Sequence, residues 1–514
     1  MHADRTPTPA EAAARVAHED LLIFINACFA CTGQREFYSD GHQQTVAIGF
    51  LHEYIRGNYR RLYALCLAAG INDYNRGRIL VELLVHAGDV DRAARREEGA
   101  LIAAALAELP PPRAYRVLAA LRVRRVNNRR ARAIVREYLD GRRDLAFDAV
   151  KYRGKLRALA RHAHLRLPGE VGSFVAQGWK QRRYATPLFD AFRRAHHSAE
   201  AIYELPYTVA EGLAARMKID RAVFLERIAG KMTRAERMRT QESARRAGAA
   251  LEFDLAAAPL TRLALHVLGL PEATRRADLE RLDAAMRASA RRALERAPLR
   301  LGSVVCVLDR SSSSAGSEEK RRRPLAVALA TRYLVEAASD DATFLFTPEG
   351  DGHPLLLGPS GQTDLATPLL GALGRGPELL LIVSDGWEND PPGAAARIAR
   401  LYRRHLDPGR RTAILHLNPV FEATELGPKA IDPAIPTLGV RDAEDLPTLL
   451  AFARFVDGAL GIDALEANLE ARAAAMLGRH ARRRARGPGA DDARPAEVDE
   501  ADPVDEAEDR EADR

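Results

Sequence analysis

The chain has 514 residues, of which 47% are hydrophobic and 29% charged, which is enough apolar material for sizeable cores in a soluble protein of about two to four domains. No apolar run approaches the roughly 20 residues that span a bilayer, and four cysteines in so long a chain argue against a disulfide framework, so we expect a cytoplasmic protein without a membrane partner. The net charge of +7 is uneven, because residues 487–514 carry 12 acids and 3 arginines, and the remaining +16 suggests an anionic partner.

Residues 20–296, after an N-terminal extension at 1–19, follow a helical periodicity. Apolar residues recur at spacings of three and four between Gly and Pro breaks, as in "RILVELLVHAGDVDRAARREEGALIAAALAELPPP". Several segments of similar length follow one another, which predicts an all-α module of stacked helical repeats of the HEAT-like kind. Cys28 and Cys31 form a CxxC inside an apolar helical stretch, where buried thiols are more typical than a zinc site.

A dense basic cluster lies within this helical module. Residues 122–166 contain 15 Arg or Lys against 4 acids, and Tyr138, Phe147 and Tyr152 are interleaved with them. Arginine and lysine neutralise phosphates, and exposed aromatic rings stack on unpaired bases, so the cluster is a candidate nucleic-acid interface. The alternative is a solvated arginine-rich face whose aromatic rings pack inward, and spacing alone does not decide between them.

Residues 297–460 alternate between strand-like and helix-like segments. The predicted strands are 303–309, 342–347, 378–386 and 411–419, and the predicted helices are 324–338, 365–373, 393–406 and 443–460. This alternation predicts an α/β domain with a doubly wound, Rossmann-like and mostly parallel sheet, which binds ligands at the carboxyl ends of its strands. A C-terminal helix at 461–486 and a disordered acidic tail at 487–514 should follow.

Carboxylates and hydroxyls gather where these strands end. Asp309 ends one predicted strand, and Ser311 and Ser313 follow it. Thr363 lies in a glycine-flanked loop, and Asp385 ends another strand. If the sheet is doubly wound, these groups meet at one edge, where an all-oxygen set suits a hard cation such as Mg²⁺. The alternative for "DRSSSS" alone is a serine-rich turn.

At these residues the chain resembles a von Willebrand factor A (vWA) domain with a metal-ion-dependent adhesion site, over about residues 300–460. The family pattern is Asp-x-Ser-x-Ser, a later Thr and a later Asp, and Ser312 stands where the family usually has Gly. The resemblance implies that Mg²⁺, or another oxygen-preferring divalent cation, completes its shell with a carboxylate from an acidic protein ligand. The metal ligands that it implies are Asp309, Ser311, Ser313, Thr363 and Asp385.

A helical module followed by a vWA domain resembles the TROVE architecture of Ro ribonucleoproteins. The stretches that carry the likeness are "VNNRRARAIVREYL" and "ELPYTVAEGLAARMKIDRAVFLERIAGKMT". The resemblance implies that the helical module binds small or misfolded RNA. The residues that we expect to contact RNA phosphates are Arg129, Arg130, Arg132, Arg136, Lys151 and Arg153.

Two classes of function follow from these patterns. The first is a divalent-metal-dependent binding protein that binds RNA through the helical module and an acidic ligand through the metal site. The alternative is a vWA adaptor that recruits substrates to a MoxR-type AAA+ ATPase. We expect no enzyme, because neither a paired base nor a nucleophile accompanies the predicted site.

Overall fold

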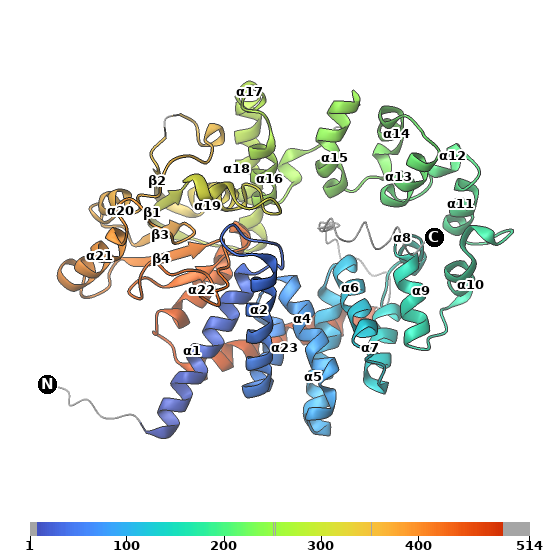
Figure 1. Cartoon of the computed structure of the whole chain (residues 1–514), viewed down its shortest axis with the longest axis horizontal. Coiled ribbons are helices and arrows are strands. Elements are labelled where there is room, and N and C mark those ends of the chain that lie inside the picture. The colour runs from blue at the N-terminus through green and yellow to red at the C-terminus, as the bar shows by residue number, and fades with distance from the viewer. Residues whose placement is uncertain (1–7, 250, 252, 351, 487–514) are drawn as a thin grey trace. The chain divides into compact units, whose positions relative to one another are not determined.

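The chain divides into two compact units. The computed structural model describes residues 8–249, 251, 253–350 and 352–486, so the predicted tail at 487–514 lies outside the described residues. Unit 1 comprises Met1–Asn75 and Asp254–Ala471, and unit 2 comprises Arg76–Phe253 and Arg472–Arg514 (Figure 1). Unit 1 therefore takes residues from both ends of the predicted helical module. No helix in the described part of the chain combines the length and hydrophobicity that crossing a bilayer requires.

Unit 1 is built around a sheet of five parallel strands in the order β2-β1-β3-β4-β5. The strands are β1 (Leu301–Asp309), β2 (Ser339–Thr347), β3 (Leu379–Val383), β4 (Ala413–Asn418) and β5 (Thr437–Gly439). The prediction of a parallel sheet in an α/β domain is confirmed. The strand β5 was not predicted, since three residues are too few to form a recognisable apolar run.

Helices cover both faces of this sheet. Val305 and Val307 of β1 pack with α20 and α21 on one face, and α19 covers the other face (Figure 1). The helix α19 is buried on nearly all sides because α16 and α18 pack against it too. The helices of unit 1 are α1 (Pro9–Ala30), α2 (Gly41–Asn58), α3 (Arg60–Leu65), the start of α4 (Asp73–Val85), α16 (Leu260–Gly269), α17 (Glu272–Ala277), α18 (Leu279–Arg296), α19 (Arg323–Ala338), α20 (Ala366–Leu373), α21 (Ala394–Leu401), α22 (Leu446–Val456) and the first part of α23 (Ile462–Arg486).

The first helix, α1, belongs to the sheet unit because it docks on β5. The Asn26 side-chain amide donates a hydrogen bond to the Thr437 carbonyl oxygen at 2.9 Å, and the Gly439 N–H donates to the Asn26 side-chain oxygen at 2.5 Å. The apolar face of α1, with Phe24 and Phe29, is buried, and so are the cysteines of its CxxC. Most of α1 falls within the predicted helical module, but in the structure the helix extends the core of the α/β unit.

Unit 2 is entirely helical in its described residues, which confirms the predicted all-α part of the chain. Tyr115 is almost fully buried in it, with its ring centroid 5.9 Å from that of Tyr138 and 4.8 Å from that of Tyr152. The aromatic rings of the basic cluster therefore pack inward, except for Phe147, which is 37% exposed. Its helices are the later part of α4 (Asp73–Val85), α5 (Arg92–Glu108), α6 (Pro111–Val123), α7 (Arg129–Asp140), α8 (Leu145–Lys151), α9 (Arg153–His162), α10 (Gly169–Gln177), α11 (Pro187–Ala195), α12 (Ala199–Ile202), α13 (Tyr207–Arg216), α14 (Arg221–Ile228), α15 (Arg234–Ala247) and the end of α23 (Ile462–Arg486).

The substitution Gly439→Ala tests the docking of α1 on β5. An added Cβ would lie 2.6 Å from the Asn26 carbonyl oxygen and 2.9 Å from the Ala30 Cβ, so α1 would have to shift. We expect the free energy of unfolding to fall by about 1–3 kcal/mol, the usual cost of overpacking, measured by urea denaturation. The control is Gly57→Ala on α2, where no atom lies within 4 Å, and it should be neutral or slightly stabilising. Equal stability of the Gly439 variant and the wild type would contradict this packing.

Candidate functional site

The register of two central strands brings the acidic residues together. Leu308 of β1 is paired with Val383 of β3, so Asp309 and Asp385 follow at neighbouring strand ends. The strand order reverses between β1 and β3, and open α/β sheets bind ligands at such a point. Each aspartate is only 4% exposed. The sheet thus delivers two buried carboxyl groups to its ligand-binding edge.

Hydroxyl groups surround this pair. One oxygen of Asp309 accepts a hydrogen bond from the Ser311 N–H at 2.8 Å, and the other accepts one from the Ser384 hydroxyl at 2.8 Å. The hydroxyl oxygens of Ser311 and Ser313 are 3.1 Å apart, and Ser313 also hydrogen-bonds to Asp385. Four of the five predicted metal ligands therefore form one connected cluster. The sequence reasoning missed Ser384, although its place immediately before Asp385 was a usable signal.

Thr363, the fifth predicted ligand, lies on an adjoining loop. Its N–H donates a hydrogen bond to the Asn389 side-chain oxygen at 2.8 Å. The Ser312 N–H and hydroxyl both donate to the Gly361 carbonyl, at 3.0 and 2.9 Å, which links this loop to the serine loop. Within the described residues, the Thr363 hydroxyl makes no hydrogen bond to the other four predicted ligands.

Tyr38, between α1 and α2, also reaches the cluster. Its hydroxyl donates to an oxygen of Asp385 at 3.0 Å, and its ring centroid is 5.4 Å from that of Trp387. A buried ion pair between Glu36 and Lys320 anchors this segment nearby. No motif could have revealed the residue, because it precedes the first aspartate by most of the helical part of the sequence.

Burial dominates the electrostatics of the cluster. It raises the pKa of Asp309 to about 7, and the negative charge of Asp385 contributes to the same rise. Burial also raises the pKa of Asp385, against the hydrogen bonds from Ser313 and from the Trp387 N–H. A divalent cation would remove the cost of keeping both groups charged, and its preferred ligands are oxygens. The described residues contain no cluster of three or more His, Cys, Asp or Glu side chains suited to a metal, so hydroxyls would have to complete this set.

A second candidate site is a basic groove in unit 2, between α5 and α7. It encloses about 1570 Å³, and Glu97 is the one acid among the residues that form its walls in the described part of the chain. Arg130 contacts Glu98 at 3.4 Å, which fixes its side chain against α5. The arginines of the groove are Arg92, Arg95, Arg96, Arg129 and Arg130. The sequence reasoning missed the three on α5, although "RAARR" was a visible signal.

Of the six residues predicted to contact RNA, some make contacts inside unit 2 and others line the groove. Lys151 is 3.9 Å from Glu236, and Arg153 donates to the Phe174 carbonyl at 3.3 Å, so both connect parts of unit 2 to one another. The other four are on α7: Arg129, Arg130, Arg132 and Arg136. Only the first two of these line the groove.

The fold and the sites define an α/β protein with a carboxylate–hydroxyl cluster at the edge of its sheet and a separate all-α unit with a basic groove. No protein-family model matches the chain, and no curated protein matches it. Among solved structures, the Ro (RSR) protein of Deinococcus radiodurans is similar, with 15% sequence identity and a TM-score of 0.43 over 86% of this chain and 100% of that one. Similarity at this level shows neither a family nor a function.

The variant Asp309→Asn tests the strain between the buried carboxyl groups. Because the folded pKa of Asp309 is about 7 and the unfolded value is near 4, folded protein binds more protons than unfolded protein between these pH values. The metal-free wild type should therefore lose stability as the pH rises from about 4 to 7, and the variant should lose less. We expect a difference on the order of 2 kcal/mol in favour of the variant at pH 7.5, measured by denaturation in EDTA.

The control for this experiment is Asp341→Asn, which removes an exposed acid of β2. It should retain the pH dependence of the wild type. If the stability of the Asp309 variant depends on pH in the same way as that of the wild type, Asp309 does not have the raised pKa that we assign to it.

Proposed function

We propose that this chain is a divalent-metal-dependent, TROVE/Ro-like binding protein of the cytoplasm that binds small or misfolded RNA in the groove between α5 and α7. The observation that carries the proposal is the presence of five arginines against one acid in that groove. Arginines bind phosphates through a planar set of donors and gain affinity by releasing counterions. Arg92 and Arg129 are the first residues of α5 and α7, where the positive ends of the helix dipoles reinforce their charge.

The second part of the proposal is a vWA-type metal site that binds an acidic ligand. Mg²⁺ or another oxygen-preferring divalent cation would be held by the cluster, and when bound it would attract a further carboxylate. The buried, all-oxygen donor set supports this, as does its place at the reversal of strand order. Exposed rings of Phe37, Tyr38 and Trp387 lie beside the cluster, so they favour a ligand that carries an apolar group near its carboxylate. The ligands would be Asp309, Ser311, Ser313, Thr363 and Asp385.

Reversal of two groove charges tests the RNA function. In Arg96→Glu/Arg129→Glu, we expect the affinity for a small hairpin RNA to fall at least tenfold at about 100 mM salt, measured by fluorescence anisotropy. The slope of log K against log salt should fall by about one for each lost arginine. Both side chains are exposed, so the fold should survive.

The matched control reverses Arg234 and Arg239 on α15. Arg234 is the first residue of its helix, as Arg129 is, and both control side chains are exposed. If this control weakens binding equally, net charge rather than the groove is responsible. If the wild type binds no RNA at about 50 mM salt, the proposed RNA function is wrong. The better hypothesis is then an adaptor that recruits substrates to an AAA+ ATPase.

Thermal denaturation with and without Mg²⁺ tests the metal site. Ligand binding to the folded state should raise the melting temperature of the wild type by about 2–4 °C at saturating Mg²⁺. Asp385→Asn should abolish this rise. Asp364→Asn, a neighbouring acid whose side chain accepts a hydrogen bond from the Thr367 N–H, should retain it. A wild type that does not respond to Mg²⁺, Mn²⁺ or Ca²⁺ would refute the proposed site.

A further inference from the structure

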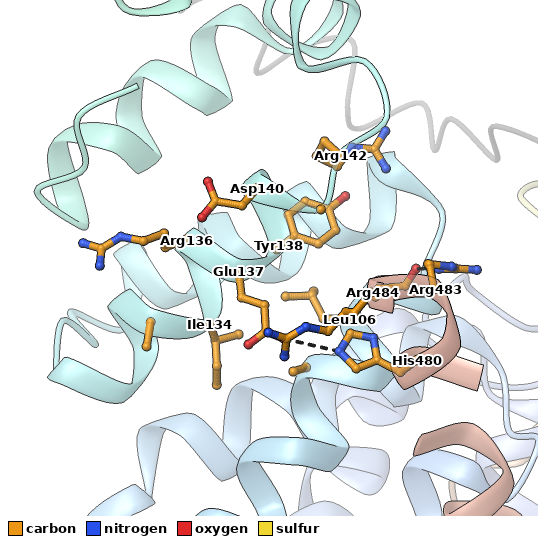
Figure 2. A pocket seen from close by; sticks show the side chains of 14 residues that line it. Leu106, Ile134, Arg136, Glu137, Tyr138, Asp140, Arg142, His480, Arg483 and Arg484 are labelled. Atoms are coloured by element: carbon orange, nitrogen blue, oxygen red, sulfur yellow. Dashed lines mark hydrogen bonds and ion pairs between the residues drawn. The ribbon is translucent and has the colours of Figure 1, made fainter. Parts of the chain in front are cut away.

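A more enclosed pocket lies in unit 2 beside the basic groove. It has a volume of about 420 Å³, within the range of about 300–1,000 Å³ that is usual for small-molecule sites. Its apolar part comes from Leu106 of α5, Ile134 of α7 and three alanines. Figure 2 shows polar side chains of α7 on one side of it and those from the end of α23 on the other.

The polar groups of this pocket are only partly engaged with one another. Glu137 is 2.7 Å from Arg484 and 3.3 Å from the Nε2 of His480, which joins α7 to α23. Arg136 and Asp140 are exposed on α7. Their charges are therefore available to a ligand with both an anionic group and hydrogen-bond donors.

Two further polar atoms at the pocket lack hydrogen-bond partners among the described residues. They are the hydroxyl of Tyr138, whose side chain is more than nine-tenths buried, and the Nδ1 of His480. Such groups are rare in folded proteins, and an ordered water or ion is one way in which the missing partner is supplied. Both atoms are themselves buried, so the polar groups that the pocket presents to a ligand, beside its apolar wall, are those of Arg136 and Asp140.

The pocket and the basic groove adjoin along α7. Ala133 lines both of them, with Arg129 and Arg130 on the groove side and Arg136 on the pocket side. A strand whose phosphates follow the groove arginines would therefore reach the pocket about one helical turn further along α7.

We propose that the pocket receives one unpaired nucleotide of the RNA strand whose phosphates lie in the groove. This inference rests on the proposed function. The apolar wall would bury a face of the base, Arg136 would neutralise its phosphate, and Asp140 would accept hydrogen bonds from the base or the ribose. A base inside a duplex is stacked and paired and cannot enter, so the pocket adds a preference for single-stranded segments to the charge-based affinity of the groove.

The variant Ala103→Phe tests the proposal, because it fills the pocket without removing a charge. Two RNAs are compared by anisotropy: a hairpin with an unpaired 3′ tail and the same hairpin with a blunt end. We expect the variant to bind the tailed RNA about tenfold more weakly, the size of effect typical of one base contact, and the blunt RNA normally. The salt dependence should remain that of the wild type, since no phosphate contact is lost.

Two further variants keep the test decisive if Ala103→Phe misfolds. Asp140→Ala removes the proposed hydrogen-bond acceptor from an exposed position and should weaken the tailed RNA relative to the blunt one. Ala158→Phe on α9, a half-buried alanine that does not line the pocket, should bind both RNAs as the wild type does. Circular dichroism checks the helical content of all variants.

The outcomes separate this inference from the function on which it rests. If pocket variants bind tailed RNA normally while reversal of the groove charges weakens it, the pocket inference is overturned and the RNA function stands. If the wild type binds neither RNA, the proposed function fails. Titration with free nucleoside monophosphates is the second arm: binding that Ala103→Phe abolishes, with tailed RNA unaffected, would assign the pocket to a free nucleotide and overturn the strand proposal.

Discussion

The structure depends on a single constraint, which is that the register of β1 and β3 places two carboxyl groups at one buried edge. Leu308 is opposite Val383, so Asp309 and Asp385 lie at neighbouring strand ends, where each is only 4% exposed. Two such groups cannot both be charged at little cost in a low-dielectric site, so either a proton or a cation must compensate. The hydroxyls around them can donate hydrogen bonds but carry no charge, so they orient the pair without neutralising it.

The surrounding residues hold this edge in one geometry. Gly386 follows Asp385 with φ +81°, and a Cβ there would lie 2.6 Å from the Lys429 carbonyl oxygen, so only glycine fits this turn. His416 is fully buried, with its Nε2 3.0 Å from the Ser384 carbonyl, and burial lowers its pKa to about 4. It is therefore neutral at physiological pH and acts as a fixed part of the scaffold. Rigid support of this kind holds the side-chain oxygens at this edge of the sheet in one arrangement.

The sequence was informative where its signals were local. Strands such as β1 and β3 are continuous apolar runs, and each delivers its aspartate at its end, so both the parallel sheet and the clustering of Asp309 with Asp385 could be expected. Contacts between distant segments could not, and for this reason Tyr38 and the docking of α1 on β5 were missed. The exposure of a basic side chain depends equally on packing: Lys151 and Arg129 look alike in the sequence, but only one of them lines an open groove.

The two sites also differ in how far the solvent can reach them. The groove arginines are mostly exposed, so salt screens their attraction over a distance of about 10 Å at 0.1 M. The buried aspartates are shielded from that screening, and their charge state follows pH instead. The pocket beside the groove differs from both sites, because the proposed burial of a base face in it would depend on neither salt nor pH. A ligand that engages the groove and the pocket is therefore held partly by charge, which salt weakens, and partly by apolar contact, which salt leaves largely intact. If the proposed RNA function holds, ionic strength should in this way separate selective binding of unpaired RNA from general attraction to polyanions.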